Sequence, residues 1–254
     1  MNKLSCVENY IDSNSNHFGS FLIEPLEIGQ GITLGNALRR TLLSDLSGFA
    51  ITGARINNLK HEFSIVEGLR EDLLEILLNL KEIVFKSSIF SKRAFNKING
   101  QLNLKGPLVV TAGMLNLEEN TLKIVNPSQY ICTILDNSEL HLSIDIEKGK
   151  GYQLAEENTD QNWQDTFLPS EVSTLKVDAL FMPIKKATYK IKLIHDTKGN
   201  IKESLQFEIL TNGSITPKRA LQEALKIIVN ILFPLFNSSE FLNLSSQLAT
   251  NYFN

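Results

Sequence analysis

The feature that most constrains this chain is an apolar stripe in the segment "TPKRALQEALKIIVNILFPLF" (216–236). Thr216 is a favourable helix N-cap and Pro217 a favourable first helical residue, so the pattern predicts a helix over 217–236. Apolar residues recur at helical spacing along it: Leu221, Ala224, Leu225, Ile228, Leu232 and Leu235, widened by Ile227 and Ile231. A helix this apolar is rarely exposed on a monomer.

A second amphipathic helix is predicted in "ITLGNALRRTLLSDLSG" (32–48), with Thr33 as N-cap and Gly48 as stop. At 100° per residue one face, the core or dimer side, collects Leu34, Ala37, Leu38, Thr41 and Leu42. Leu43 falls on the other face between Arg39 and Arg40. An apolar residue flanked by two guanidiniums is typical of a protein interface. Two solvated arginines beside a leucine are the alternative.

The remaining N-terminal part predicts strands and one further helix. "FGSFLIEPLEIG" (18–29) indicates strand, turn and strand, and residues 49–59 indicate a strand leading into a turn. Residues 61–85 predict an amphipathic helix, with Ser64 and Glu67 at capping-box spacing.

The middle of the chain is rich in short alternating segments. Residues 86–155 predict an antiparallel sheet, and the polar residues 155–170 predict a loop that Trp163 anchors by packing. Strands resume over 173–195, and 201–210 is the expected return strand of a hairpin. The order of elements predicts an α+β fold, in which a β-rich insertion splits a first domain built from both chain ends.

Composition narrows the function. The 254 residues suffice for one large domain or two modest ones, and 43% hydrophobic with 21% charged residues is the globular range. A net charge of −3 disfavours nucleic-acid binding by bulk electrostatics. No apolar run has the length of a membrane span, and the N-terminus lacks a signal-peptide core.

No motif for catalysis, phosphate binding or metal binding is present. Cys6 and Cys132 are far apart, which predicts neither a disulfide framework nor a zinc site, and Cys132 in "YICTIL" is expected to be a small buried hydrophobe. "KGKGY" (148–152) favours a tight turn over a phosphate loop. The chain is therefore expected to be a scaffold with no catalytic residues, no metal and no cofactor of its own.

Several long blocks resemble, in order, the alpha subunit family of bacterial-type DNA-directed RNA polymerase. The resemblance rests on "IEPLEIGQGITLGNALRRTLLSDLSG", "HEFSIVEGLREDLLEILLNLKEI", "GKGY", "VDALFMPIKKATYKI" and "TNGSITPKRALQEAL" and covers about residues 18 to 236. It implies a homodimeric platform for the beta and beta-prime catalytic subunits. It also implies a discontinuous dimerisation domain (1–47 and 183–236), a β-rich insert domain (48–182) and a short tail (237–254).

The resemblance also implies site residues. Contacts to beta are expected at Arg39, Arg40, Leu43, His61, Glu62, Ser64, Glu67 and Lys81. Contacts to beta-prime are expected at Val177, Asp178, Lys185 and Lys186. The dimer interface is expected at Leu34, Leu38, Leu42, Leu221, Leu225, Ile228 and Leu232.

The family usually continues into a carboxy-terminal DNA-binding domain, which is expected to be absent here, so contact with DNA would be only indirect. The Asn/Ile/Lys-rich usage and the missing transit peptide suggest a plastid-encoded protein of the chloroplast stroma, with a bacterial cytoplasm as the alternative. A free-standing enzyme and a regulatory binding module of the same fold are the competing functions.

Overall fold

Two larger antiparallel sheets, three two-stranded sheets and three α-helices make up the described part of this computed structural model, which comprises residues 3–13, 15–57, 59, 63, 65–87, 97–117, 122–155, 174–195 and 199–236. The helices are α1 (Gln30–Ser44), α2 (Leu73–Lys81) and α3 (Pro217–Phe236), with a 3-10 turn at Ala112–Met114. The larger strands are β1 (Lys3–Ile11), β2 (His17–Leu26), β3 (Ser47–Ile56), β5 (Lys97–Lys105), β10 (Glu139–Lys150), β14 (Ile184–His195) and β15 (Ile201–Thr211). The shorter strands are β4 (Phe85–Ser87), β6 (Leu108–Thr111), β7 (Asn116–Leu117), β8 (Leu122–Ile124), β9 (Tyr130–Ile134), β11 (Tyr152–Gln153), β12 (Leu175–Lys176) and β13 (Ala179–Leu180).

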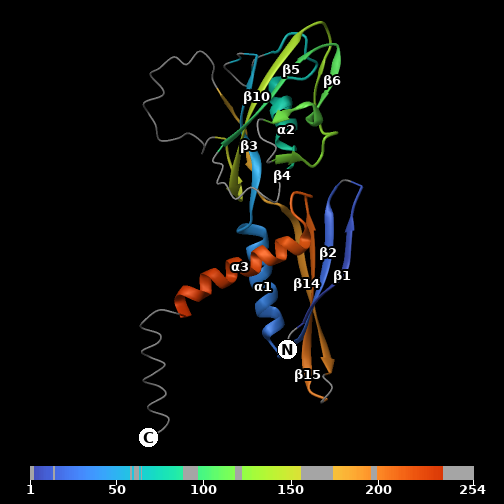
Figure 1. The fold of residues 1–254 in the computed structure, drawn as a ribbon, viewed down its shortest axis with the longest axis vertical. Helices are drawn as coiled ribbons and strands as arrows, with labels where there is room; N and C mark the ends of the chain where they lie inside the picture. The colour runs from blue at the N-terminus through green and yellow to red at the C-terminus, as the bar shows by residue number, and fades with distance from the viewer. Residues whose placement is uncertain are drawn as a thin grey trace.

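The first sheet joins the two ends of the described chain. Its strand order is β1-β2-β15-β14, and both α1 and α3 pack on the same face (Figure 1). Alternate residues of β2 and β15 point toward the helices and are buried there, as the period of two in a half-covered sheet requires. This core contains Phe21, Ile23, Leu26, Leu38, Leu42, Leu46, Ile184, Ala187, Leu205, Phe207, Ile209, Ala220, Leu221 and Ala224.

The second sheet is built only from the middle of the chain. Its order is β12-β3-β10-β5-β7, and α2 packs against β3 and against β9, which pairs with β6. The resulting core runs from Ile51 to Val177, and Leu73, Ile76, Leu77 and Leu80 are its contribution from α2. The chain therefore has a discontinuous core made by both ends and a continuous core between them. The dimerisation and insert roles given to these parts stay predictions.

Several elements match the expectation from sequence. α3 begins at Pro217 and ends at Phe236, β15 is the return strand of a hairpin with β14, and the middle of the chain is antiparallel. Gly151 forms the turn between β10 and β11 that "KGKGY" predicts. Within the described residues no helix is long and apolar enough to cross a membrane.

Other boundaries were wrong. Residues 17–26 form one strand, β2, and β1 before it was not anticipated. α1 starts at Gln30 after Gly29, so Thr33 is not its N-cap, and Gly48 lies within β3 rather than ending the helix.

Among the described residues of the predicted helix over 61–85, only Leu73–Lys81 are helical, and this helix follows Asp72. Gly68 has a φ of +81°, which no helical residue adopts, and Leu69 forms a β-bridge with Ile134. The predicted cap Ser64, most of the 155–170 loop with Trp163, and the tail 237–254 lie outside the described residues.

Candidate functional site

The outer face of α1 carries the arginine pair that the sequence singled out. Both Arg39 and Arg40 are exposed, and neither guanidinium has an ion-pair or hydrogen-bond partner among the described residues. Leu43 differs from the expectation, because it is half-buried and packs against the helix-covered core instead of standing out as a knob. The face is therefore two unpaired cations over a partly buried leucine.

Lys81 lies in a polar cluster that joins two predicted surfaces. Its Nζ is 3.2 Å from Asp178 Oδ2 and donates to the Tyr152 hydroxyl at 3.3 Å. Tyr152 in turn donates to Asp178 Oδ2 at 2.7 Å, and the Ala155 N–H donates to Oδ1 at 3.0 Å. Lys81 was expected to contact beta, and Asp178 was expected to contact beta-prime. The structure places these two residues in direct contact with each other. Tyr152 is a member that the sequence reasoning missed.

The cluster perturbs both charged groups. Hydrogen bonds from Tyr152 and the Ala155 N–H, together with Lys81, lower the pKa of Asp178. Burial by itself would lower the pKa of Lys81, but its hydrogen bonds to Tyr152 and Asp178 and the attraction of the carboxylate outweigh burial and raise it. Both groups therefore stay charged through the neutral range.

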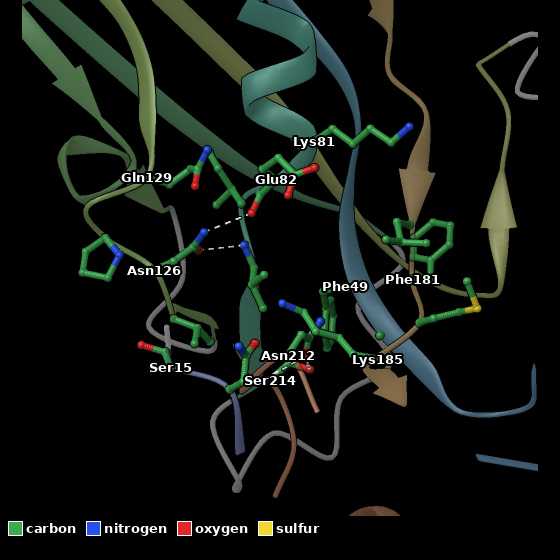
Figure 2. Close-up of a pocket in the computed structure, with 18 of the residues that line it drawn as sticks. Ser15, Phe49, Lys81, Glu82, Asn126, Gln129, Phe181, Lys185, Asn212 and Ser214 are labelled. Carbon is green, nitrogen blue, oxygen red and sulfur yellow. Dashed lines mark hydrogen bonds between the residues drawn. The ribbon is translucent and has the colours of Figure 1, made fainter. Parts of the chain in front are cut away.

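A cavity of about 740 Å³ lies between the two sheets, next to this cluster. Figure 2 shows Asn126 and Gln129 on one side and Phe181 with Lys185 on the other. Asn126 accepts the Val84 N–H at 2.9 Å and donates to the Glu82 carbonyl at 3.0 Å, which ties that wall to the end of α2. The lining mixes amide, hydroxyl and aromatic groups with the charged side chains of Lys81, Glu82 and Lys185.

Only some of the residues that were expected to contact beta-prime are exposed. Lys185 and Lys186 are exposed at the start of β14, where a register shift lies between Ile184 and Lys186. Val177 is only 3% exposed and belongs to the core of the second sheet, so the single chain presents almost none of it to a partner, and its expected contact with beta-prime stays a prediction. Its position between exposed Lys176 and half-buried Asp178 could have identified it as inward-facing.

The expected dimer residues divide by burial. Leu38, Leu42 and Leu221 are 0%, 0% and 1% exposed because the core of the first sheet covers them within the single chain, and their expected place in a dimer seam stays a prediction. Leu34, Leu225 and Ile228 are half-buried against that core. Leu232 is 58% exposed.

The apolar surface of α3 lies beyond the residues that sequence reasoning chose. Its C-terminal half extends past the sheet (Figure 1) and exposes Val229, Ile231, Leu232, Phe233, Leu235 and Phe236 by 57–65% each. The apolar spacing in the sequence does not distinguish the exposed C-terminal half of α3 from its buried first half, because the same spacing continues through both halves.

The other expected contacts lie around α2. Glu67 is exposed in the turn before Gly68, whereas His61, Glu62 and Ser64 lie outside the described residues. Within the described residues, no group of three or more His, Cys, Asp or Glu side chains is placed to hold a metal ion.

Comparison with known proteins adds a consistent set of relatives. Residues 54–182 match the family model of the RNA polymerase Rpb3/RpoA insert domain. The chain is 45% identical over 233 residues to the DNA-directed RNA polymerase subunit alpha of Pyrenomonas salina, covering 92% of this chain and 70% of that protein. It is 42% identical over 252 residues to that of Pyropia yezoensis (98% and 74%) and 43% identical over 246 residues to that of Mesostigma viride (96% and 73%).

The matched family model begins inside β3 and ends just before β14, and so spans most of the continuous core. The matches to the three relatives extend over both sheets, since they cover more than nine-tenths of the chain.

Proposed function

This chain belongs to the family of DNA-directed RNA polymerase alpha subunits, and from that premise we propose that it forms a homodimer on which the beta and beta-prime subunits assemble. Membership places the chain in a multisubunit nucleotidyltransferase. Our proposal adds that this subunit is non-catalytic, needs no cofactor of its own and meets DNA only through the complex. No observation on the described residues favours a free-standing enzyme or an independent regulatory module.

The observation that carries the dimer is the bare apolar half of α3. Six large apolar side chains, each more than half exposed, follow one another within Val229–Phe236. A contiguous apolar surface of this kind marks an interface. Since the first half of α3 is buried in its own chain, we assign the dimer seam to the second half, with Leu34, Leu225 and Ile228 at its margin.

The proposed contacts to the large subunits use the charged surfaces. Arg39 and Arg40 have no partner among the described residues, and guanidiniums pair bidentately with carboxylates in interfaces. We assign them, with Leu43, to beta. Lys185, Lys186 and Asp178 are assigned to beta-prime, and Lys81 supports both surfaces through its ion pair with Asp178.

The three relatives compared above come from algae. We therefore propose that the protein works in a plastid, with the stroma as its compartment. Fractionation of organelles with an antibody to the chain tests this assignment.

Arg40→Ala tests the platform directly. The full chain is purified as wild type, as Arg40→Ala and as Arg219→Ala, a control that removes another exposed arginine, from the first turn of α3, where it pairs with Glu223. Arg40→Ala is expected to stay dimeric by size-exclusion chromatography and to weaken capture of purified beta by at least about tenfold, the range of an interface hot spot. Arg219→Ala is expected to capture beta normally. Full capture by Arg40→Ala would refute this assignment of the surface.

A further inference from the structure

The N-terminus of α1 is capped by a residue on a strand that is distant in the sequence. α1 has no local cap, since Gly29 has no side chain and the first turn carries no acidic residue. Instead the Gly31 N–H donates to Glu203 Oε2 at 2.8 Å and the Gly29 N–H donates to Oε1 at 3.0 Å. Glu203 lies on β15, 172 positions after Gly31, and is 8% exposed.

Both oxygens of the carboxylate are used in this contact. The first N–H groups of a helix have no intrahelical acceptor, and the helix dipole places partial positive charge there. A buried carboxylate that accepts two of these groups forms strong charge-assisted hydrogen bonds. Among the described residues Glu203 has no cationic partner, so the end of α1 is the group that neutralises it.

The residue before Glu203 also contacts the segment that leads into α1. Lys202 forms an ion pair with Glu27, and the Glu27 N–H donates to Gln30 Oε1 at 3.0 Å. Two consecutive residues of β15 therefore hold the entry to α1 at Glu27 and at Gly29–Gly31. At a third contact, Gly35 of α1 approaches the ring of Tyr189 so closely that a Cβ would not fit between them.

From this geometry we infer that Glu203 is a positioning residue for the partner-binding face of α1. This inference rests on the function proposed above. Arg40 follows Gly31 by nine residues, about 13 Å along a rigid helix, so a shift at the capped end moves the guanidinium. Interface hot spots tolerate little displacement, because their hydrogen bonds are directional.

The test uses the full chain as Glu203→Gln, with Glu208→Gln as the matched control. Glu208 lies on the same strand but pairs with Thr188 and Lys190 rather than with α1. Glu203→Gln keeps the shape of the side chain and replaces one acceptor by a donor that faces a backbone N–H. Two readouts are needed: hydrogen exchange of the Gly29 and Gly31 amides, and capture of purified beta by the folded dimer.

We expect Glu203→Gln to speed exchange of both amides about tenfold and to weaken capture of beta at least about threefold, with the dimer intact. Glu203→Asp, which retains the charge but withdraws it by one methylene, should fall between Gln and wild type in both readouts. A purely structural role would change the free energy of unfolding without this graded loss of capture. Glu208→Gln should change neither readout.

Unchanged amide exchange in Glu203→Gln would overturn the cap, and faster exchange with full capture would overturn the positioning role. If Glu203→Gln gives no folded dimer, the same two outcomes are read from Glu203→Asp. Arg40→Ala in the same assay separates the two proposals: full capture by Arg40→Ala refutes the beta surface itself, whatever Glu203 does.

Discussion

Gly35 of α1 lies directly against the ring of Tyr189 of β14. A methyl group built on Gly35 would lie 2.8 Å from two ring carbons. The ring has little room to retreat, because it stacks on Phe207 and its hydroxyl donates to Asn36 Oδ1 at 2.7 Å. The close approach of helix and sheet therefore requires a residue without a Cβ at this position.

Gly35→Ala is expected to lower the free energy of unfolding by about 1–3 kcal/mol through overpacking, despite the higher helix propensity of alanine. Urea denaturation of both proteins measures the change. In a Tyr189→Ala background the clash is gone, so Gly35→Ala should become neutral or stabilising. Equal destabilisation in both backgrounds would contradict this explanation.

Leaving the Asp145 carboxylate without a partner should cost more stability than leaving its cationic partners without one. Both of its oxygens accept from Arg55 Nη2 at 3.0–3.1 Å, and Lys97 Nζ lies 3.0 Å away. The Asp145 side chain is 4% exposed, whereas those of Arg55 and Lys97 are 39% and 49% exposed and can reach water.

Arg55→Met combined with Lys97→Met is therefore expected to lower the free energy of unfolding by about 2–4 kcal/mol, because it strands a buried charge. Asp145→Asn should lower it by about 1–2 kcal/mol. Chemical denaturation at pH 7 compares the two. If Asp145→Asn lowered the free energy of unfolding more than the double variant does, the unpaired cations, and not the unpaired carboxylate, would be the costly groups.

The Lys81–Asp178 pair predicts a specific pH dependence. The pKa of Asp178 is lowered on folding, so its contribution to stability is present above the unfolded pKa of about 3.9 and is lost as the pH falls through the folded value. The pKa of Lys81 is raised, so its contribution is present below about 10.4 and is lost at higher pH.

Asp178→Asn should therefore be less stable than wild type by about 1 kcal/mol or less at pH 6, because the pair is partly exposed. The difference should shrink as the pH falls below about 4. Urea midpoints between pH 3 and pH 6 measure it, with Glu67→Gln as an exposed control. A difference that is constant across this range would exclude the ion pair as its cause.

The two cysteines should differ sharply in reactivity. Burial, with a smaller effect of Glu71, raises the pKa of Cys132 to about 12, and its side chain is fully buried, as the sequence predicted. Cys6 is an exposed free thiol on β1. At pH 8 the folded protein should take up one iodoacetamide group, on Cys6, and a second only in denaturant. Mass spectrometry of the intact protein and its peptides counts both, and rapid labelling of Cys132 in the folded state would contradict the burial.

Leu232→Asp should break the homodimer without unfolding the chain. Leu232 is 58% exposed, so a carboxylate there is tolerated in the free chain but would be desolvated in an apolar seam. Leu193→Asp is the matched control, since Leu193 is 69% exposed on β14 and distant from α3. Analytical ultracentrifugation should find Leu232→Asp monomeric and Leu193→Asp dimeric. A stable Leu232→Asp dimer would exclude this half of α3 as the seam.

Local pattern was sufficient for a substantial part of this protein. The start of α3 at Pro217, the return strand β15, the turn at Gly151 and the buried face of α2 all follow from turn chemistry and periodicity, which act over a few residues. The family could also be inferred from the sequence, because several long blocks of residues resemble those of the family and occur in the same order. The same local pattern failed between residues 65 and 72, where the backbone of Gly68 and the bridge from Leu69 to Ile134 replace the expected helix.

The tertiary structure decided which surface each pattern faces. Periodicity assigns Leu38, Leu42 and Leu221 to an apolar face, but only the packed sheet shows that the chain itself covers them and leaves Leu232 bare. The meeting of Lys81 with Asp178 and the capping of α1 by Glu203 join positions 97 and 172 residues apart. No local signal encodes such contacts, because they exist only once the strands have paired and the helices have packed on them.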